Sequence, residues 1–382
     1  MIKPTQHTTG RSVVRSLAVA LAAVSLAALT ACASPSPSPV ITHQPVAHPT
    51  SPIPRQAAAP TQILGGDCTR LVPLPAIQAA LASTAVVAQS VPSPEEYFNL
   101  LPLPTAGGLH CSWQDTTGGN LLDVELLPNA TAVLAADASS LASSNNSGLP
   151  TVGDQSWSSC VAPSVTDGEC RFNIRVGSYW LSVDEAIDNR PRPVSLSAAE
   201  VTMFGDIVAT VRGLPAQPRW TAPTDSLILP TSCTGAVSLA SVRGAFADAT
   251  LTLSDGTDDG EDIDHAANTI TRSVECDWIS ASPTTGADVS FEIIPGSAWA
   301  WSAATGPTVD PEEVAWSHQP GLGTTAWGGC VGGDDGSGTC TLDVLARNTW
   351  FEIDESFANG IPTMPPLTTL AHTVLSNIGF SS

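Results

Sequence analysis

The sequence has almost no lysine. Lys3 is the only one among 382 residues. A P-loop needs a lysine to reach the nucleotide phosphates, and Schiff-base or pyridoxal phosphate chemistry needs one as the nucleophile. The chain beyond Lys3 therefore excludes these chemistries, and we expect no cofactor.

Nucleophilic catalysis also lacks its usual residues. There is no Gly-x-Ser-x-Gly elbow, and no histidine recurs between the two repeated halves described below. His110, for example, is replaced by Glu275 in the second half. A nucleophile needs a base within hydrogen-bond reach, so we predict that the protein is not an enzyme. An envelope glycan-acting hydrolase is the alternative.

No apolar run has the roughly 20 residues that a membrane span needs. A basic start precedes the uncharged run Leu17–Leu29, which is typical of a signal peptide. Leu29-Thr30-Ala31-Cys32 then resembles the bacterial lipoprotein box, in which the cysteine is acylated. We predict a lipoprotein signal over 1–31 and an anchor to the lipid bilayer through acylated Cys32. The alternative is a secretory signal with a chance cysteine.

Residues 32–60 are predicted to form a tether rich in proline and serine. Such a segment favours extended polyproline conformations of roughly 3 Å per residue, so it could hold the folded part on the order of 80 Å from the membrane.

Acidic side chains dominate the rest of the chain. The net charge is −22, and three of the 14 basic residues but none of the 36 acidic ones precede Cys32. A surface of this kind repels nucleic acid and anionic headgroups, so we expect no nucleic acid as a partner. Solubility in the envelope is the simplest explanation, and cationic partners or metal ions are the alternative.

The eight cysteines after Cys32 indicate an internal duplication, because they form two sets with equal spacing. In both sets the first two cysteines are 43 positions apart and the last two are 10 positions apart. The sets are Cys68, Cys111, Cys160 and Cys170, then Cys233, Cys276, Cys330 and Cys340. Their neighbours repeat as well. We predict copy 1 over 61–213, a linker over 214–230 and copy 2 over 231–382.

Each copy is predicted to be α+β, an antiparallel sheet with helices on one face. Apolar spacing predicts a short helix over 74–81 and over 239–246, and a closing helix capped by Ser197 and Glu200. Alternating residues predict strands over 123–127 and 288–294. The last two cysteines of each copy flank a predicted hairpin, whose second strand is expected to end at Trp180 or Trp350.

Four cysteines allow three pairings, which sequence alone leaves open. We favour pairing the first with the second and the third with the fourth, since the hairpin holds the latter two close together. Bridges of this kind are typical of exported proteins.

The early cysteine and the Cys-x-Trp motif at Cys111-Ser112-Trp113 and Cys276-Asp277-Trp278 resemble an actinobacterial lipoprotein family of unknown function. They are also similar to the disulfide-bonded extracellular sensor domains of mycobacterial receptor kinases. The resemblance implies an α+β fold and a binding or sensing role.

Two acidic motifs have residues that could serve chemistry. Asp184-Glu185 recurs as Asp354-Glu355, and paired carboxylates serve glycoside hydrolysis. Adjacent strand residues point to opposite faces, so we expect a strand-end turn or a helix start instead. Residues 255–264 resemble half of a calcium loop but lack its final glutamate, so a solvated acidic loop without metal is expected.

Six tryptophans recur beside the cysteines and are predicted to lie in the core. A further group has no counterpart in copy 1: Trp299, Trp301, Trp316 and the nearby His318. Exposed indoles bind sugars or protein partners, so we predict ligand contact there; packing on the protein's own sheet is the alternative. Together these features predict a non-catalytic, extracytoplasmic, lipid-anchored protein that binds an envelope ligand or partner.

Overall fold

The computed structural model describes residues 58–89, 98–116, 119–145, 151–161, 168–187, 196–254, 262–281, 287–301, 316–332, 337–357 and 363–380. The predicted signal peptide, Cys32 and nearly all of the tether lie outside them. Both copies belong to one compact unit, Pro52–Ser382. No helix in the described ranges is long and apolar enough to cross a membrane.

Copy 1 contains a six-stranded antiparallel sheet in the order β1-β2-β3-β6-β5-β4. Its strands are β1 (Val86–Ala88), β2 (Leu109–Asp115), β3 (Leu121–Leu127), β4 (Gln155–Val161), β5 (Gly168–Val176) and β6 (Tyr179–Ile187).

Copy 2 contains a seven-stranded antiparallel sheet in the order β10-β11-β12-β13-β9-β8-β7. Its strands are β7 (Thr252–Leu253), β8 (Val274–Ile279), β9 (Ala287–Pro295), β10 (Ser317–His318), β11 (Thr325–Gly332), β12 (Gly338–Ala346) and β13 (Thr349–Phe357). All six strands of the first sheet recur in the same order in the second, which confirms the predicted α+β duplication.

The helices flank these sheets. In copy 1 they are η1 (Ile63–Gly66), η2 (Cys68–Arg70), α1 (Leu74–Ala80), η3 (Phe98–Leu100), α2 (Pro102–Thr105), α3 (Thr131–Ser144) and α4 (Ala198–Arg212). In copy 2 they are α5 (Cys233–Ala236), α6 (Leu239–Ala245), α7 (Ile263–Thr271), η4 (Ser297–Ala300) and α8 (Met364–Asn377).

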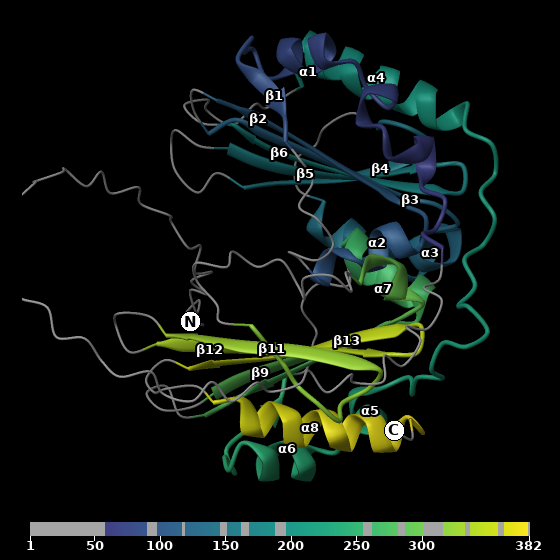
Figure 1. The fold of residues 1–382 in the computed structure, drawn as a ribbon. Coiled ribbons are helices and arrows are strands. Elements are labelled where there is room, and N and C mark those ends of the chain that lie inside the picture. The colour runs from purple at the N-terminus through teal and green to yellow at the C-terminus, as the bar shows by residue number, and fades with distance from the viewer. Residues whose placement is uncertain are drawn as a thin grey trace, which may run out of the picture. The chain divides into compact units, whose positions relative to one another are not determined.

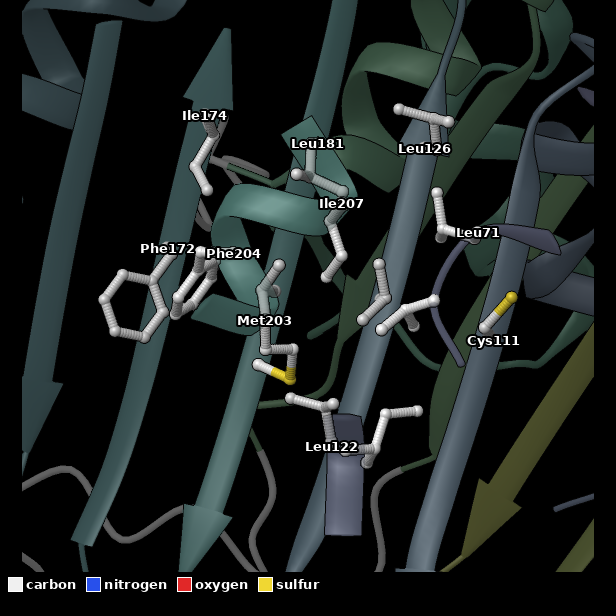
Figure 2. Packing of buried hydrophobic residues seen from close by; sticks show 14 of the residues in the cluster. Leu71, Cys111, Leu122, Leu126, Phe172, Ile174, Leu181, Met203, Phe204 and Ile207 are labelled. Atoms are coloured by element: carbon white, nitrogen blue, oxygen red, sulfur yellow. The ribbon is translucent and has the colours of Figure 1, made fainter. Parts of the chain in front are cut away.

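One face of each sheet packs on a helix pair and forms the main core. In copy 1 this pair is α1 and α4 (Figure 1), and in copy 2 it is α6 and α8. Figure 2 shows Met203, Phe204 and Ile207 of α4 directed at the strands, with the rings of Phe172 and Phe204 4.8 Å apart. Burying each such side chain stabilises the fold by roughly 1.5–3 kcal/mol.

Local capping sets where these helices begin. The Ser197 hydroxyl accepts from the Glu200 amide at 3.2 Å, and the Glu200 carboxylate accepts from the Ser197 amide, which is the predicted capping box. In copy 2, Ser238 caps the N-terminus of α6. Pro73 occupies the equivalent position before α1 in copy 1. The predicted short and closing helices are confirmed.

The favoured disulfide pairing is confirmed. Cys68 bonds Cys111 and Cys233 bonds Cys276, while the hairpin pairs Cys160–Cys170 and Cys330–Cys340 face each other across β4–β5 and β11–β12.

The second strand of each cysteine hairpin does not extend to Trp180 or Trp350, so that prediction was wrong. β5 ends at Val176 and β12 at Ala346, and each tryptophan lies at the second position of the next strand. A two-residue turn separates the strands, with positive φ at Gly177 in copy 1 and at Arg347 in copy 2. In copy 1 the Gly177-Ser178 pair was a usable signal for this turn, whereas in copy 2 an arginine is not typical of such a turn.

Helices also cover the opposite face of the sheets, which we call the inner face. There α2 and α3 of copy 1 pack with α7 of copy 2 (Figure 1). Ile263, Ala266 and Ala267 of α7 join a buried cluster with Leu127 and Trp180 of copy 1. The inner faces of the two copies are therefore packed through shared elements, and the candidate site lies there.

Candidate functional site

The inner face of copy 1 carries charged residues at alternate strand positions. Glu125 of β3 lies between Val124 and Leu126, which point into the main core. Asp184 of β6 accepts a hydrogen bond from the Arg171 Nε atom at 2.7 Å. This ion pair is partly exposed to solvent, so it contributes little to stability by itself.

His110 of β2 completes this face. Its Nε2 atom lies 3.8 Å from the Asp123 Oδ1 atom, and its Nδ1 atom is buried without a hydrogen-bond partner among the described residues. The inner face of copy 1 therefore places an arginine and a histidine among its carboxyl groups.

The inner face of copy 2 carries more carboxyl groups, and its strands place no arginine among them. Seven carboxyl groups occupy the inner positions of its strands: Glu275, Asp277, Asp288, Glu292, Asp343, Glu352 and Asp354. Strands β8, β9, β11, β12 and β13 contain no lysine or arginine. Thr341 of β12, at the position equivalent to Arg171, donates a hydrogen bond to Asp354 instead.

Three of these carboxyl groups form one hydrogen-bonded set. Glu352 is hydrogen-bonded to both Asp343 and Asp354. Burial, together with the charges of Asp354 and Asp343, raises the pKa of Glu352 well above its usual value. Burial raises the pKa of Asp343 to about 7, although a 2.8 Å hydrogen bond from the Trp350 indole opposes the shift. The set can therefore hold protons near neutral pH.

Helix α7 brings a second acidic group to the same place. Asp262 caps its N-terminus by accepting from the His265 amide at 2.8 Å. Asp264 lies in the first turn, where burial and then the charge of Asp262 raise its pKa to about 6. This helix was not predicted from the sequence, although an aspartate cap followed by apolar residues at positions 263, 266, 267 and 270 was a usable signal.

The carboxyl groups of α7 and of both sheets interact. Burial, then Asp264 and Asp184, raise the pKa of Glu125 well above its usual value. Burial, then Glu275 and Asp264, do the same for the pKa of Glu292. Glu292 is 9% exposed, and its Oε1 atom has no hydrogen-bond partner among the described residues. We call Glu125, Asp264, Glu275 and Glu292 the acidic junction.

A pocket opens beside this junction, between β8, α7 and the chain around α5. Its cavity is about 480 Å³, within the range of small-molecule sites. Glu275 and Asp277 of β8 line it with His265 and Asn268 of α7, and the remaining lining is mostly hydroxyl-bearing. No lysine or arginine lines it within the described structure.

Asn268 holds one side of the pocket in place. Its Nδ2 atom donates to the Glu275 Oε2 atom at 3.2 Å, while its Oδ1 atom has no donor among the described residues. Burial and then Asp277 raise the pKa of Glu275. The pocket thus presents carboxylate and amide oxygens that could accept hydrogen bonds.

The repeated acidic pairs do not lie at a strand end or a helix start, so that prediction was wrong. Asp184-Glu185 lies inside β6 and Asp354-Glu355 inside β13. Adjacent residues do point to opposite faces: each aspartate faces inward, while Glu185 lies across from Cys170 on the core face. Carboxyl groups meet across neighbouring strands instead of along one.

The acidic segment 255–264 is predicted from the sequence to be a solvated loop without metal. Residues 255–261 lie outside the described ranges. The remainder differs from the prediction, because Asp262, Ile263 and Asp264 begin α7 and Ile263 is buried. Among the described residues no group of acidic, histidine or cysteine side chains has metal-binding geometry.

The predicted ligand-contact residues of copy 2 are separated by burial. Trp301 is 4% exposed, and its ring packs 5.0 Å from that of Trp350. Trp299 and Trp316 are partly buried, and His318 is exposed with its ring 5.7 Å from that of Trp327. Trp301 is thus part of the core, while ligand contact by the other three residues stays a prediction.

No family model and no curated protein matches the sequence. Among solved structures, the chain is similar to a protein described as a "putative thioesterase II", from Thermobifida fusca, with 11% identity and a TM-score of 0.13. That match covers 61% of this chain and 92% of the other. A likeness at this level carries no argument about the fold or the activity.

Proposed function

We propose that the protein is a lipid-anchored, non-catalytic binding protein of the cell envelope that takes a small organic cation into the β8–α7 pocket. Its four disulfides indicate an oxidising, extracytoplasmic location. The lipoprotein box at Cys32 and the resemblance to an actinobacterial lipoprotein family support the anchor.

The observation that carries the ligand class is the charge of the pocket. Glu275 and Asp277 line a cavity that has an unpartnered Asn268 acceptor and no lining arginine or lysine in the described structure. A ligand with several N–H donors and a positive charge would satisfy these oxygens. An anionic ligand would be repelled by the Glu275 and Asp277 carboxylates, and a purely apolar ligand would give the buried Asn268 Oδ1 atom no donor, which is costly.

The geometry gives less support to a glycan hydrolase. Asp343 is 1% exposed and accepts a hydrogen bond from the Trp350 indole, so a glycan could not reach it. In the pocket, the Glu275 carboxyl group accepts from the neighbouring Asn268 amide.

Calorimetric titration of the mature chain tests the ligand class. We expect spermidine or agmatine to bind and succinate not to bind, and Glu275→Gln with Asp277→Asn to weaken binding by about tenfold or more, the scale of one lost charge-assisted hydrogen bond. Asp123→Asn, an acidic residue of copy 1 outside the pocket, is the matched control and should leave affinity unchanged.

Failure of both cations to bind would contradict the ligand class, and turnover of peptidoglycan fragments that is lost in Glu275→Gln would favour the hydrolase. The anchor is tested separately with Cys32→Ala, which should accumulate as precursor or appear in the medium. Unchanged membrane fractionation of that variant would contradict lipidation.

A further inference from the structure

Helix α7 belongs to copy 2 in sequence but packs against both sheets. Its apolar side, Ile263, Ala266 and Ala267, is buried in the cluster that covers the inner face of copy 1. It contacts α2, α3, β3 and β6 of copy 1, and also β9 of copy 2. The two small alanines permit this close approach. The helix is therefore a structural link between the two copies.

The polar side of α7 faces carboxyl groups from every strand around it. Asp264 is faced by Asp262 on its own helix, by His110 and Arg171 of copy 1 and by Glu275 of copy 2. Glu125 is faced by Asp264, Asp262, Asp184 and Arg171.

The copy 2 side is more acidic still. Glu292 is faced by Glu275, Asp277, Asp264 and Asp354, all of them carboxyl groups. On the α3 side, Asp137 is faced by His265 and Asp262. The only arginine among these groups, Arg171, already forms an ion pair with Asp184.

Two buried oxygens at this link lack partners among the described residues, Asp264 Oδ1 and Glu292 Oε1. A buried carboxylate without a partner is expensive, whereas a protonated carboxyl group costs far less.

We propose that α7 is a proton-operated latch, which holds the two copies together while Asp264, Glu125 and Glu292 carry protons and loosens as they ionise. The latch goes beyond the proposed ligand binding and does not depend on it.

The direction of the pH dependence follows from linkage. Burial raises the pKa of Asp264 to about 6 in the folded protein, and the pKa values of Glu125 and Glu292 are raised well above their usual values. The folded state therefore keeps protons that the released state gives up. Stability from these groups is fully present below about pH 4 and is lost as the pH rises through 6 and beyond.

Hydrogen exchange of the full mature chain tests the latch. The rates are corrected for the intrinsic pH dependence of exchange, and a chelator is present so that no metal ion binds the carboxyl groups. We expect the opening constant of the α7 peptide to rise at least about a hundredfold between pH 5 and pH 8. The reason is linkage: at pH values between the usual pKa of a carboxyl group and its raised pKa, each rise of one pH unit increases the opening constant about tenfold for each such group. The helices α4 and α8 should change much less.

The triple variant Asp264→Asn, Glu125→Gln and Glu292→Gln replaces each carboxyl group by an amide of nearly the same shape and should abolish this pH dependence. Glu355→Gln is the matched control, because burial raises the pKa of Glu355 to about 8 on the core face of β13, away from α7. It should leave the pH dependence of α7 intact. Protection of α7 that is independent of pH, or that is lost together with that of α4 and α8, would overturn the latch.

Discussion

At the scale of single residues, the duplication provides an internal comparison of a neutral and an ionisable acceptor. The Trp180 indole donates to Asn173 Oδ1 at 2.8 Å in copy 1, and the Trp350 indole donates to Asp343 Oδ1 at 2.8 Å in copy 2. Both acceptors are buried, at 5% and 1% exposure. Only the aspartate can ionise, so only in copy 2 does the charge of the indole acceptor depend on pH.

Replacing Asp343 by asparagine should therefore stabilise the protein at neutral and alkaline pH. Below about pH 4 the Asp343 carboxyl group is protonated in both the folded and the unfolded protein. Between about pH 4 and its raised pKa of about 7, only the folded protein keeps this proton. Stability is lost over that range, so Asp343→Asn should gain roughly 2 kcal/mol at pH 8 and little at pH 4.5. Calorimetry at both pH values would show a rise in Tm of a few degrees at pH 8 only.

The reverse change, Asn173→Asp, is the control and should lower the Tm at pH 8 more than at pH 4.5. An Asp343→Asn variant that is less stable at pH 8 would contradict this prediction, because it would mean that the negative charge of Asp343 stabilises the folded protein.

At the scale of elements, the two kinds of disulfide close loops of different length. Cys68–Cys111 closes a loop of 43 residues, whereas Cys160–Cys170 closes a loop of 10 between adjacent strands. The longer loop restricts the unfolded chain more.

Removing Cys68–Cys111 by double alanine substitution should therefore cost more stability than removing Cys160–Cys170. The loop-entropy model gives a difference of about 1 kcal/mol, measurable as a difference in denaturation midpoint followed by tryptophan fluorescence. The equivalent pairs in copy 2 have the same separations and should show the same order. A larger loss from the hairpin pair would show that native packing, not loop closure, sets the cost.

At the scale of the whole molecule, each copy supplies part of the packing of the other. Phe98 of copy 1 packs its ring 4.9 Å from that of Trp350 in copy 2, in a cluster that also contains Leu101 and Trp301. In the opposite direction, α7 of copy 2 covers Leu127 and Trp180 of copy 1.

We therefore expect neither copy to be a stable monomer alone. Residues 61–213 and 231–382, produced separately with their disulfides, should self-associate through the uncovered tryptophan faces. Mixing them should restore one species of the full-length mass in light scattering and a cooperative melting transition. Separate copies that stay monomeric and melt sharply would show that the exchanged segments are not needed.

The elements that could be predicted depend on near neighbours in the chain. The periodic apolar residues of α1, α4 and α6, the Ser197 cap and the equal cysteine spacings are local signals, so helices, hairpins, disulfides and the duplication followed from the sequence. The turn at Arg347 and helix α7 were missed because one lacks a glycine and the other is stabilised by packing on a different copy.

The acidic junction, in contrast, was decided only by the tertiary structure. Glu125, Asp264 and Glu292 are far apart in sequence, and alternation along a strand shows that a carboxylate faces away from the core but not what it faces. Strand register and the position of α7 bring these groups together. Their raised pKa values arise first from burial, and burial is a property of the assembled copies, because a side chain loses its water only when another part of the fold covers it.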